Sequence, residues 1–243
     1  MRGLPDLIVP SRFCGPPTSG NGGWTAGALA GLLGVDPAAG VTVSLLAPPP
    51  LDTPMTVETV DGSTVASLDD APVARAAAAP AGGPELAIEP VPVADARAAE
   101  ASYAGLRAHP FPTCFACGTD RADGLRIFPG RVADQGGRAR LAATWTPDDT
   151  VADDPLATTW AALDCVGGWA GDLEERMMVL ARMTAWVDNT PRIGAEHVVL
   201  GLGRGTEGRK THTSSALLDP DGRVVARAEH LWVAVDPASF GRP

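Results

Sequence analysis

The chain has 243 residues, of which 45% are hydrophobic and 20% are charged, and its formal net charge is −10. Lys210 is the only lysine, and no basic run could neutralise a phosphate backbone, so the composition excludes nucleic acid as an expected partner. No apolar run approaches the ~18 residues of a membrane-spanning helix, and the first residues lack the layout of a signal peptide. We therefore expect a cytoplasmic protein with no membrane contact.

The first half of the chain predicts one helix followed by antiparallel strands. Apolar residues recur at helical spacing over residues 24–34, where Gly34 suits a helix C-terminus, and the glycines before Trp24 are expected to precede the helix. Extended segments separated by Pro- and Gly-containing turns follow. They are residues 41–47, 55–62, 63–70 and 71–79, with 85–93 as a closing strand.

An Ala-rich segment separates the two halves. Residues 94–112 have a helix-forming composition and end in a connector that is rich in proline. We place the boundary there and divide the chain into a domain of residues 1–100 and a domain of residues 101–243. Two domains also suit a chain of this length.

The second half repeats the same plan of a helix and a strand-rich segment. The predicted helix covers residues 158–173, and the last two strands are joined by the turn sequence DPDG. The predicted strands are 123–132, 139–147, 177–188, 195–206, 208–219 and 222–236. In the last strand, alternation places His230 on one face with Val224, Ala226, Ala228, Trp232 and Ala234. A helix with an antiparallel sheet, present twice, predicts an α+β fold.

The four cysteines are Cys14, Cys114, Cys117 and Cys165. In a cytoplasmic protein they are expected to be thiols. Cys114-Phe-Ala-Cys117 has the spacing of a zinc knuckle, and His109 could be a third ligand. No second cysteine pair or paired histidines complete a tetrahedral site, however. We therefore favour packed thiols in a turn and predict neither a metal nor another cofactor.

Four segments resemble double-hotdog acyl-CoA thioesterases. HPFPTCFACGTDRADGLRIFPG resembles the CxxCG…GL segment of some hotdog thioesterases, and WAALDCVGGWA resembles the central helix of that fold, which carries one acidic residue. RFCGPPTSGNGGWTAGALAG resembles the first helix of the double-hotdog enzymes, and DGRVVARAEHLWVAV resembles their terminal strand. The resemblance implies two tandem hotdog domains, each a curved antiparallel sheet wrapped around a central helix.

The resemblance also implies a set of catalytic residues. In the family, an aspartate on the second helix activates water together with polar residues on the strands, and Asp164 matches that aspartate. The family's glutamine on the last strand falls on His230. The family's hydroxyl partner has no clean match here. Thr206, Thr211 and Thr213 lie nearby and Arg204 could occupy the place, so the assignment stays open, with Thr213 as the candidate that we name.

The residues around Asp164 suit thioester hydrolysis. A carboxylate in an apolar helix is partly desolvated, which raises its pKa and makes it a better general base. The glycine pair Gly167–Gly168 lies on the same helical side and would let a substrate approach closely. The Gly22–Gly23 amides before Trp24 would bind the carbonyl oxygen. Trp24 and Trp160 are also assigned to the binding site, where Trp160 would line the acyl part.

Several alternatives remain open at the sequence level. Asp164 could be a structural acid, and the protein could be a hotdog domain that binds an acyl thioester or another apolar ligand without cleaving it. A hotdog dehydratase needs an Asp and a His a few residues apart, and no such pattern occurs. The Arg204, Arg209 and Lys210 cluster is favoured as a solvated hairpin, with binding of an anionic substrate tail as the alternative. Exposed sheet faces would allow a homo-oligomer.

Overall fold

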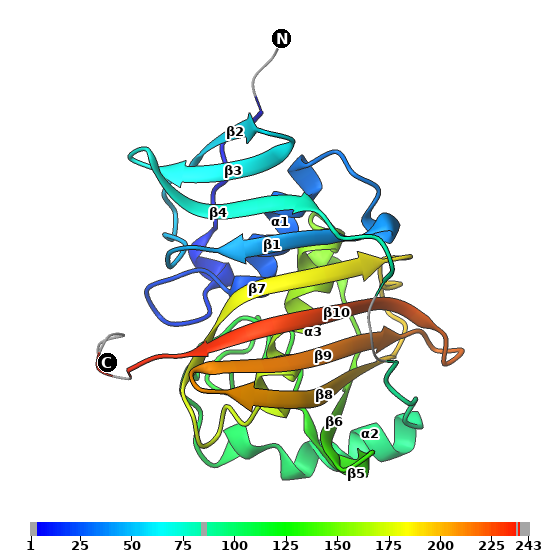
Figure 1. The fold of residues 1–243 in the computed structure, drawn as a ribbon. Coiled ribbons are helices and arrows are strands. Elements are labelled where there is room, and N and C mark those ends of the chain that lie inside the picture. Colours follow the sequence, from blue (N-terminus) through cyan, green and yellow to red (C-terminus); the bar gives the residue numbers. More distant parts are fainter. Residues whose placement is uncertain (1–3, 84–86, 237, 239–243) are drawn as a thin grey trace.

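A single antiparallel sheet organises the computed structural model, which describes residues 4–83, 87–236 and 238 (Figure 1). Within these residues the strand order is β2-β3-β4-β1-β7-β10-β9-β8-β6-β5. The first-half strands are β1 Val41–Leu45, β2 Thr56–Val60, β3 Ser63–Leu68 and β4 Ala71–Ala78. The second-half strands are β5 Gly130–Gln135, β6 Arg138–Trp145, β7 Met178–Val187, β8 His197–Glu207, β9 Lys210–Leu218 and β10 Val224–Ala234.

The two halves are joined through the pairing of β1 with β7. Val43 lies opposite Met183 in this antiparallel ladder, so the strands of the first half continue directly into those of the second. The domain boundary near residue 100 stays a prediction. It falls between β4 and β5, beside the short helix α2 (Val93–Ala99).

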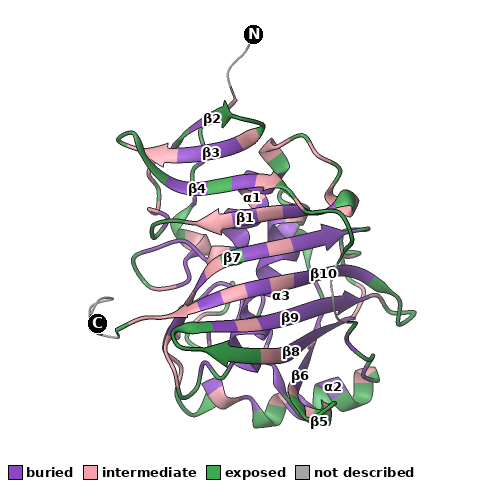
Figure 2. Ribbon diagram, in the orientation of Figure 1, coloured by how far each residue is buried: buried purple, intermediate pink, exposed green. Residues whose placement is uncertain are grey.

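Two helices cover one face of the sheet. Helix α1 (Gly22–Leu32) packs on strands of the first half and α3 (Pro155–Ala170) on strands of the second, and the helices also pack against each other (Figure 1). Almost every residue of α3 is buried, as the uniform colour of this helix in Figure 2 shows. A helix that is apolar on all sides has to be enclosed on all sides, which explains the near-continuous apolar sequence. Among the described residues, no helix is long and apolar enough to cross a membrane.

Glycine allows the two helices to approach closely. Gly23 and Gly27 lie one turn apart on the face of α1 that meets α3. A Cβ atom on Gly27 would lie 2.7 Å from Ala157 Cα and 2.8 Å from Trp160 Cβ. These separations are shorter than a carbon–carbon contact, so the observed helix contact requires glycine at this position.

The structure corrects two predictions made from the sequence. Helix α1 begins at Gly22, so the paired glycines form its first turn instead of preceding it; Asn21 is the N-cap and its Oδ1 accepts a hydrogen bond from the Trp24 N–H. Residues 87–92 form no strand, and residues 85–86 of the same predicted strand lie outside the described residues. Ile88 and Val91 instead pack on the sheet face opposite α3, together with Val198 and Leu200.

The starts of β5 and β10 also differ from the prediction. Residues 123–129 are irregular because Leu125 and Ile127 donate backbone hydrogen bonds to Phe115 and Ala116 in the loop that holds Cys114 and Cys117. In β10 the predicted alternation fails at its start. Val224 is exposed and Val225 is buried, because the pairing register with β9 shifts between Val224 and Ala226.

Candidate functional site

Asp164 lies in the middle of α3 and is only 2% exposed. Its Oδ2 accepts a hydrogen bond of 2.8 Å from the backbone N–H of Gly23, in the first turn of α1. Its Oδ1 is buried and has no hydrogen-bond partner among the described residues. Burial raises the pKa of Asp164 to about 7, although the Gly23 N–H and the nearby Asn21 side chain oppose this shift by stabilising the charged form. The carboxyl group of one half is therefore held by the helix start of the other half.

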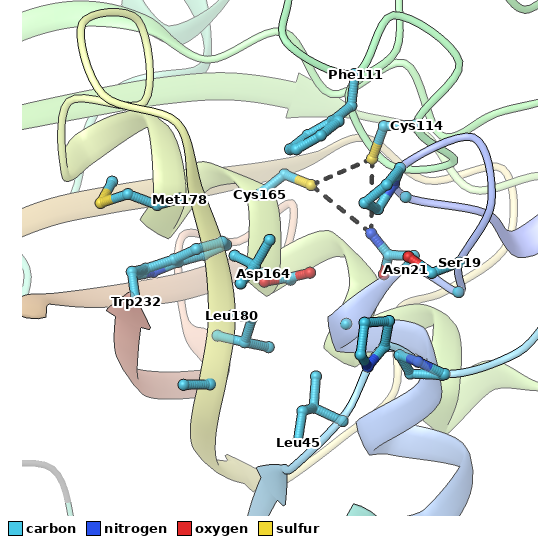
Figure 3. A pocket seen from close by; sticks show the side chains of 18 of the residues that line it. Ser19, Asn21, Leu45, Phe111, Cys114, Asp164, Cys165, Met178, Leu180 and Trp232 are labelled. Atoms are coloured by element: carbon cyan, nitrogen blue, oxygen red, sulfur yellow. Dashed lines mark hydrogen bonds between the residues drawn. The ribbon is translucent and has the colours of Figure 1, made fainter. Parts of the chain in front are cut away.

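A cavity of about 200 Å³ lies between the two halves and includes Asp164 in its wall (Figure 3). Asn21 and Gly22 come from the start of α1, and Asp164 and Cys165 from α3. The apolar part of the wall is formed by side chains from β1, β7, β10 and the neighbouring loops. It includes Leu45, Pro48, Phe111, Met178, Leu180 and Trp232. An apolar cavity with a few polar groups at one side is typical of small-ligand sites.

Asn21 is a residue that the sequence analysis missed. It lines the cavity, caps α1, and directs its side-chain amide toward two sulfur atoms, at 3.6 Å from Cys114 Sγ and 3.8 Å from Cys165 Sγ. Its position directly before the helix is a recognisable N-cap signal. No local pattern shows that the amide group of Asn21 reaches the other half of the chain.

The predicted helpers of Asp164 lie together, but apart from the cavity wall. His230 Nδ1 is 3.2 Å from Thr213 Oγ1, and Trp232 Nε1 donates a hydrogen bond of 3.1 Å to the same oxygen. Because Thr213 accepts from Trp232, its hydroxyl is available to donate to His230 Nδ1, and Nε2 faces Ser215 Oγ at 3.4 Å. Burial lowers the pKa of His230 to about 4, so the ring is neutral near pH 7.

Gly167 and Gly168 face the sheet instead of the cavity. A Cβ atom on Gly167 would lie 2.8 Å from His230 Nδ1 and 2.9 Å from Thr213 Oγ1, and one on Gly168 would lie 3.0 Å from the Trp232 ring. These glycines let α3 lie close to β9 and β10. None of Gly167, Gly168, His230 and Thr213 is a wall residue of the cavity, and no hydrogen bond joins the last two to Asp164 within the described part of the chain.

Of the remaining predicted binding residues, one lies in the cavity wall and three do not. Gly22 lies in the cavity wall, and its backbone N–H has no acceptor among the described residues. Trp24 and Trp160 are core residues: Trp24 stacks on Phe13 with ring centres 4.2 Å apart, and Trp160 packs against Gly27. Arg204 forms an ion pair of 2.6 Å with Glu229 and does not line the cavity.

Comparison with known proteins identifies the fold. No family model and no curated protein matches the sequence. Among solved structures, the tesB protein of Mycobacterium avium subspecies paratuberculosis is 16% identical, with a TM-score of 0.60 over 97% of this chain and 95% of that chain. The chain is a double hotdog. A hotdog-fold protein of unknown function from Alicyclobacillus acidocaldarius is 14% identical, with a TM-score of 0.61 over 96% of this chain and 93% of that one.

A third structure agrees with this result. The acyl-CoA thioesterase II TesB2 of Mycobacterium marinum is 16% identical, with a TM-score of 0.56 over 89% of this chain and 91% of that chain. The predicted α+β fold of two tandem hotdog domains is therefore confirmed. Because a fold hosts many activities, the function has to be argued from the site. In this double hotdog, that site is the cavity beside Asp164, where the two central helices meet.

Proposed function

We propose that this protein hydrolyses an acyl thioester, such as an acyl-CoA, with Asp164 as the base that activates water. The observation that carries the proposal is the arrangement of the Asp164 carboxyl group. Oδ2 is fixed by the Gly23 N–H, whereas Oδ1 is buried without a hydrogen-bond partner among the described residues, on a side chain that belongs to the cavity wall. A buried polar atom without a partner is costly, and a water molecule held at Oδ1 would remove that cost.

The chemistry follows from this arrangement. The water attacks the thioester carbonyl carbon while Asp164 accepts its proton, which gives a tetrahedral intermediate with a negative oxygen. The intermediate collapses, the carbon–sulfur bond breaks, and the proton held by Asp164 passes to the leaving sulfur. The products are a carboxylic acid and a thiol. A base with a pKa near the working pH is efficient in this role, and burial raises that of Asp164 to about 7.

The Gly22 N–H is our candidate donor to the negative oxygen. It lies at the positive end of the α1 dipole, belongs to a residue that lines the cavity, and has no acceptor in the described residues. The Gly23 N–H, which the sequence analysis also assigned to the carbonyl, is used by Asp164. We assign His230 and Thr213 a positioning role, because they lie beneath α3 and contact it at Gly167.

The wall of the cavity supports an acyl substrate. Apolar side chains line the same cavity as Asp164, among them Leu45, Met178, Leu180 and Trp232 (Figure 3). Burial of an acyl chain against such groups contributes roughly 0.8 kcal/mol for each CH₂. The thiol carrier would therefore extend from the mouth of the cavity, with the reacting carbonyl beside Asp164.

The test compares Asp164→Asn with wild type on a panel of acyl-CoAs of different lengths. We expect kcat to fall at least about 100-fold, which is the usual contribution of a general base. Asp153→Asn is the matched control, since Asp153 is an exposed acid just before α3. It should hydrolyse at the wild-type rate. A fully active Asp164→Asn variant would contradict the proposal.

The second candidate is a hotdog protein that binds an acyl thioester or another apolar ligand without cleaving it. One observation favours it: no hydrogen bond links Asp164 to His230 or Thr213 in the described residues, although the double-hotdog resemblance pairs such residues. Wild-type protein that binds an acyl-CoA in calorimetry, but releases no free thiol from any member of the panel, would support this candidate.

A further inference from the structure

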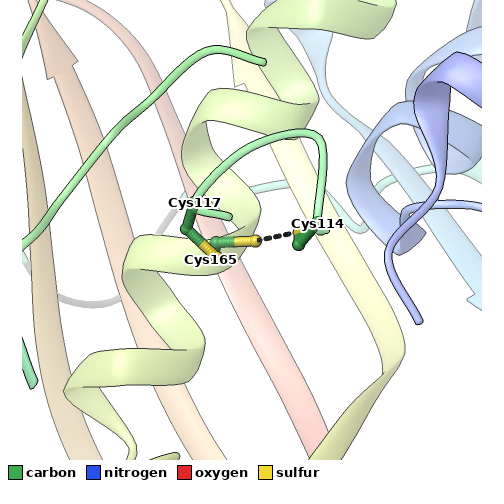
Figure 4. A group of neighbouring side chains, drawn as sticks. All are labelled: Cys114, Cys117 and Cys165. Atoms are coloured by element: carbon green, nitrogen blue, oxygen red, sulfur yellow. Dashed lines mark hydrogen bonds between the residues drawn. The ribbon is translucent and has the colours of Figure 1, made fainter. Parts of the chain in front are cut away.

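Three cysteines from two distant segments form a buried cluster beside the cavity. Cys114 and Cys117 lie in the loop before β5, and Cys165 lies on α3 (Figure 4). Their sulfur atoms all lie within 4.8 Å of one another, and Cys114 Sγ is 3.6 Å from Cys165 Sγ. All three residues line the cavity. All three side chains also pack in the main core, but the proposed hydrolysis uses none of the three thiols.

The loop that holds Cys114 and Cys117 is built as a tight turn. The Gly118 N–H donates to the Cys114 carbonyl at 2.8 Å, which closes the turn. A Cβ atom on Gly118 would lie 2.5 Å from the carbonyl oxygens of Cys114 and Pro112, so only glycine fits there. The Tyr103 hydroxyl also donates to the Cys117 carbonyl at 3.0 Å. The loop therefore holds both sulfur atoms on the side of Cys165.

The neighbouring donors suit sulfur atoms that carry negative charge. The Asn21 amide donates to Cys114 Sγ at 3.6 Å and to Cys165 Sγ at 3.8 Å. Such outer donors commonly support the thiolate ligands of a metal.

The spacing fits a thiophilic ion. Zn²⁺ binds thiolate sulfur at about 2.3 Å with tetrahedral geometry, which places two ligand sulfurs about 3.8 Å apart. The separation of Cys114 and Cys165 is 3.6 Å, and the other pairs need to close by no more than about 1 Å from the 4.8 Å limit. Three thiolates select Zn²⁺ over harder cations such as Mg²⁺ or Ca²⁺.

His109 does not supply the fourth ligand in its present state. Its Nδ1 accepts a hydrogen bond of 2.9 Å from the Phe111 N–H, so the proton of the neutral ring is on Nε2. Nε2 lies 3.1 Å from the Cys117 carbonyl and 3.4 Å from Cys117 Sγ, and as a donor it holds the loop. An ion bound by the three cysteines would thus keep a fourth position toward the cavity that they line.

We propose that Cys114, Cys117 and Cys165 bind one Zn²⁺ ion, with the fourth coordination position open to the cavity beside Asp164. This site is independent of the hydrolysis proposed for Asp164, and it would link the loop between the two halves to helix α3. Binding replaces the thiol protons with the ion, so one equivalent of Zn²⁺ releases protons to the solvent.

The experiment uses the full chain, reduced and stripped of metal, and titrates it first with Co²⁺ and then with Zn²⁺. We expect one equivalent of Co²⁺ to bind with a strong sulfur-to-cobalt charge-transfer band and tetrahedral visible bands, and Zn²⁺ to displace it. Cys114→Ser, Cys117→Ser and Cys165→Ser should each weaken Zn²⁺ binding by more than about 100-fold, which exceeds the usual loss for an outer-shell change.

Cys14→Ser is the matched control, because Cys14 is also a buried free cysteine but lies outside the cluster. It should bind metal as wild type does. Reduced wild-type protein that gives no charge-transfer band, or a Cys14→Ser variant that loses binding equally, would overturn the proposal. So would isolation of a Cys114–Cys165 disulfide in protein that takes up no metal after reduction. If a serine variant does not fold, the wild-type cobalt titration alone decides the outcome.

Discussion

The contact between α1 and α3 predicts that Gly27→Ala destabilises the protein, although alanine is the better helix former. Gly27 is a buried residue in α1, and an added Cβ atom would lie 2.7 Å from Ala157 Cα and 2.8 Å from both Cβ and Cγ of Trp160. Carbon atoms prefer to be about 3.5–4 Å apart. The helices therefore have to separate, since Ala157 Cα belongs to the backbone of α3 and cannot rotate away.

The magnitude follows from two opposing terms. Replacing glycine with alanine inside a helix stabilises the folded state by up to ~1 kcal/mol, whereas overpacking a well-packed contact costs about 1–3 kcal/mol. Backbone contacts place Gly27 at the upper end of that range, so we expect a net loss of about 2 kcal/mol. For a chain of this length, this loss lowers Tm by roughly 4–8 °C.

Gly31→Ala is the control, because it lies one turn further along the same helix. Among the described residues, and apart from the chain neighbours of Gly31 and the nearby backbone of α1, the only heavy atom within 4 Å of its added Cβ would be Leu156 Cδ2, at 3.7 Å, which is an ordinary contact. This variant should gain up to ~1 kcal/mol. Urea unfolding of both variants, with fluorescence of the buried tryptophans as the signal, measures the difference of about 3 kcal/mol. Equal stabilities for the two variants would refute the reasoning.

Two further predictions concern the layer beneath α3. Gly167→Ala should lower the free energy of unfolding by about 1–3 kcal/mol in urea, because its Cβ atom would meet His230 Nδ1 at 2.8 Å; an unchanged midpoint would contradict the observed packing. Burial lowers the pKa of His230 to about 4 in the folded protein, whereas the pKa of an unfolded histidine is about 6.5. As the pH decreases, the unfolded chain therefore binds the proton first. The free energy of unfolding then falls between about pH 6.5 and pH 4. Wild type should lose about 2 kcal/mol of unfolding free energy through His230 between pH 7.5 and pH 5, and His230→Gln should not show this loss. A variant whose stability depends on pH as wild type does would disprove the lowered pKa of His230.

Local sequence patterns were sufficient for most secondary-structure elements. Alternation and Pro- or Gly-containing turns predicted β1–β4 and β6–β10, because those signals depend on residues a few positions apart. The strand predicted at 85–93 was wrong because such local signals do not show whether a segment meets a partner strand. Its apolar residues match a strand, but Ile88 and Val91 pack across the outer face of β8 and no partner strand is available in the described residues.

The sequence also singled out Asp164, because a carboxylate in a continuous apolar helix is unusual. What the sequence could not determine was its surroundings. Gly23, which holds Oδ2, is 141 residues away along the chain. The placement of His230 and Thr213 against Gly167, rather than in the cavity wall, depends on how α3 lies on β9 and β10.

The cysteine cluster was also only partly predictable from the sequence. The sequence shows the Cys114–Cys117 pair, and from the sequence alone His109 was the candidate for a third ligand because it lies close by in the chain. The third sulfur comes from Cys165, which is 51 residues from Cys114. Local propensity and turn chemistry determine the elements, since they act between neighbours in the chain. The packing of two helices on a shared sheet decided which distant side chains meet, because only the burial of both apolar faces fixes their relative position.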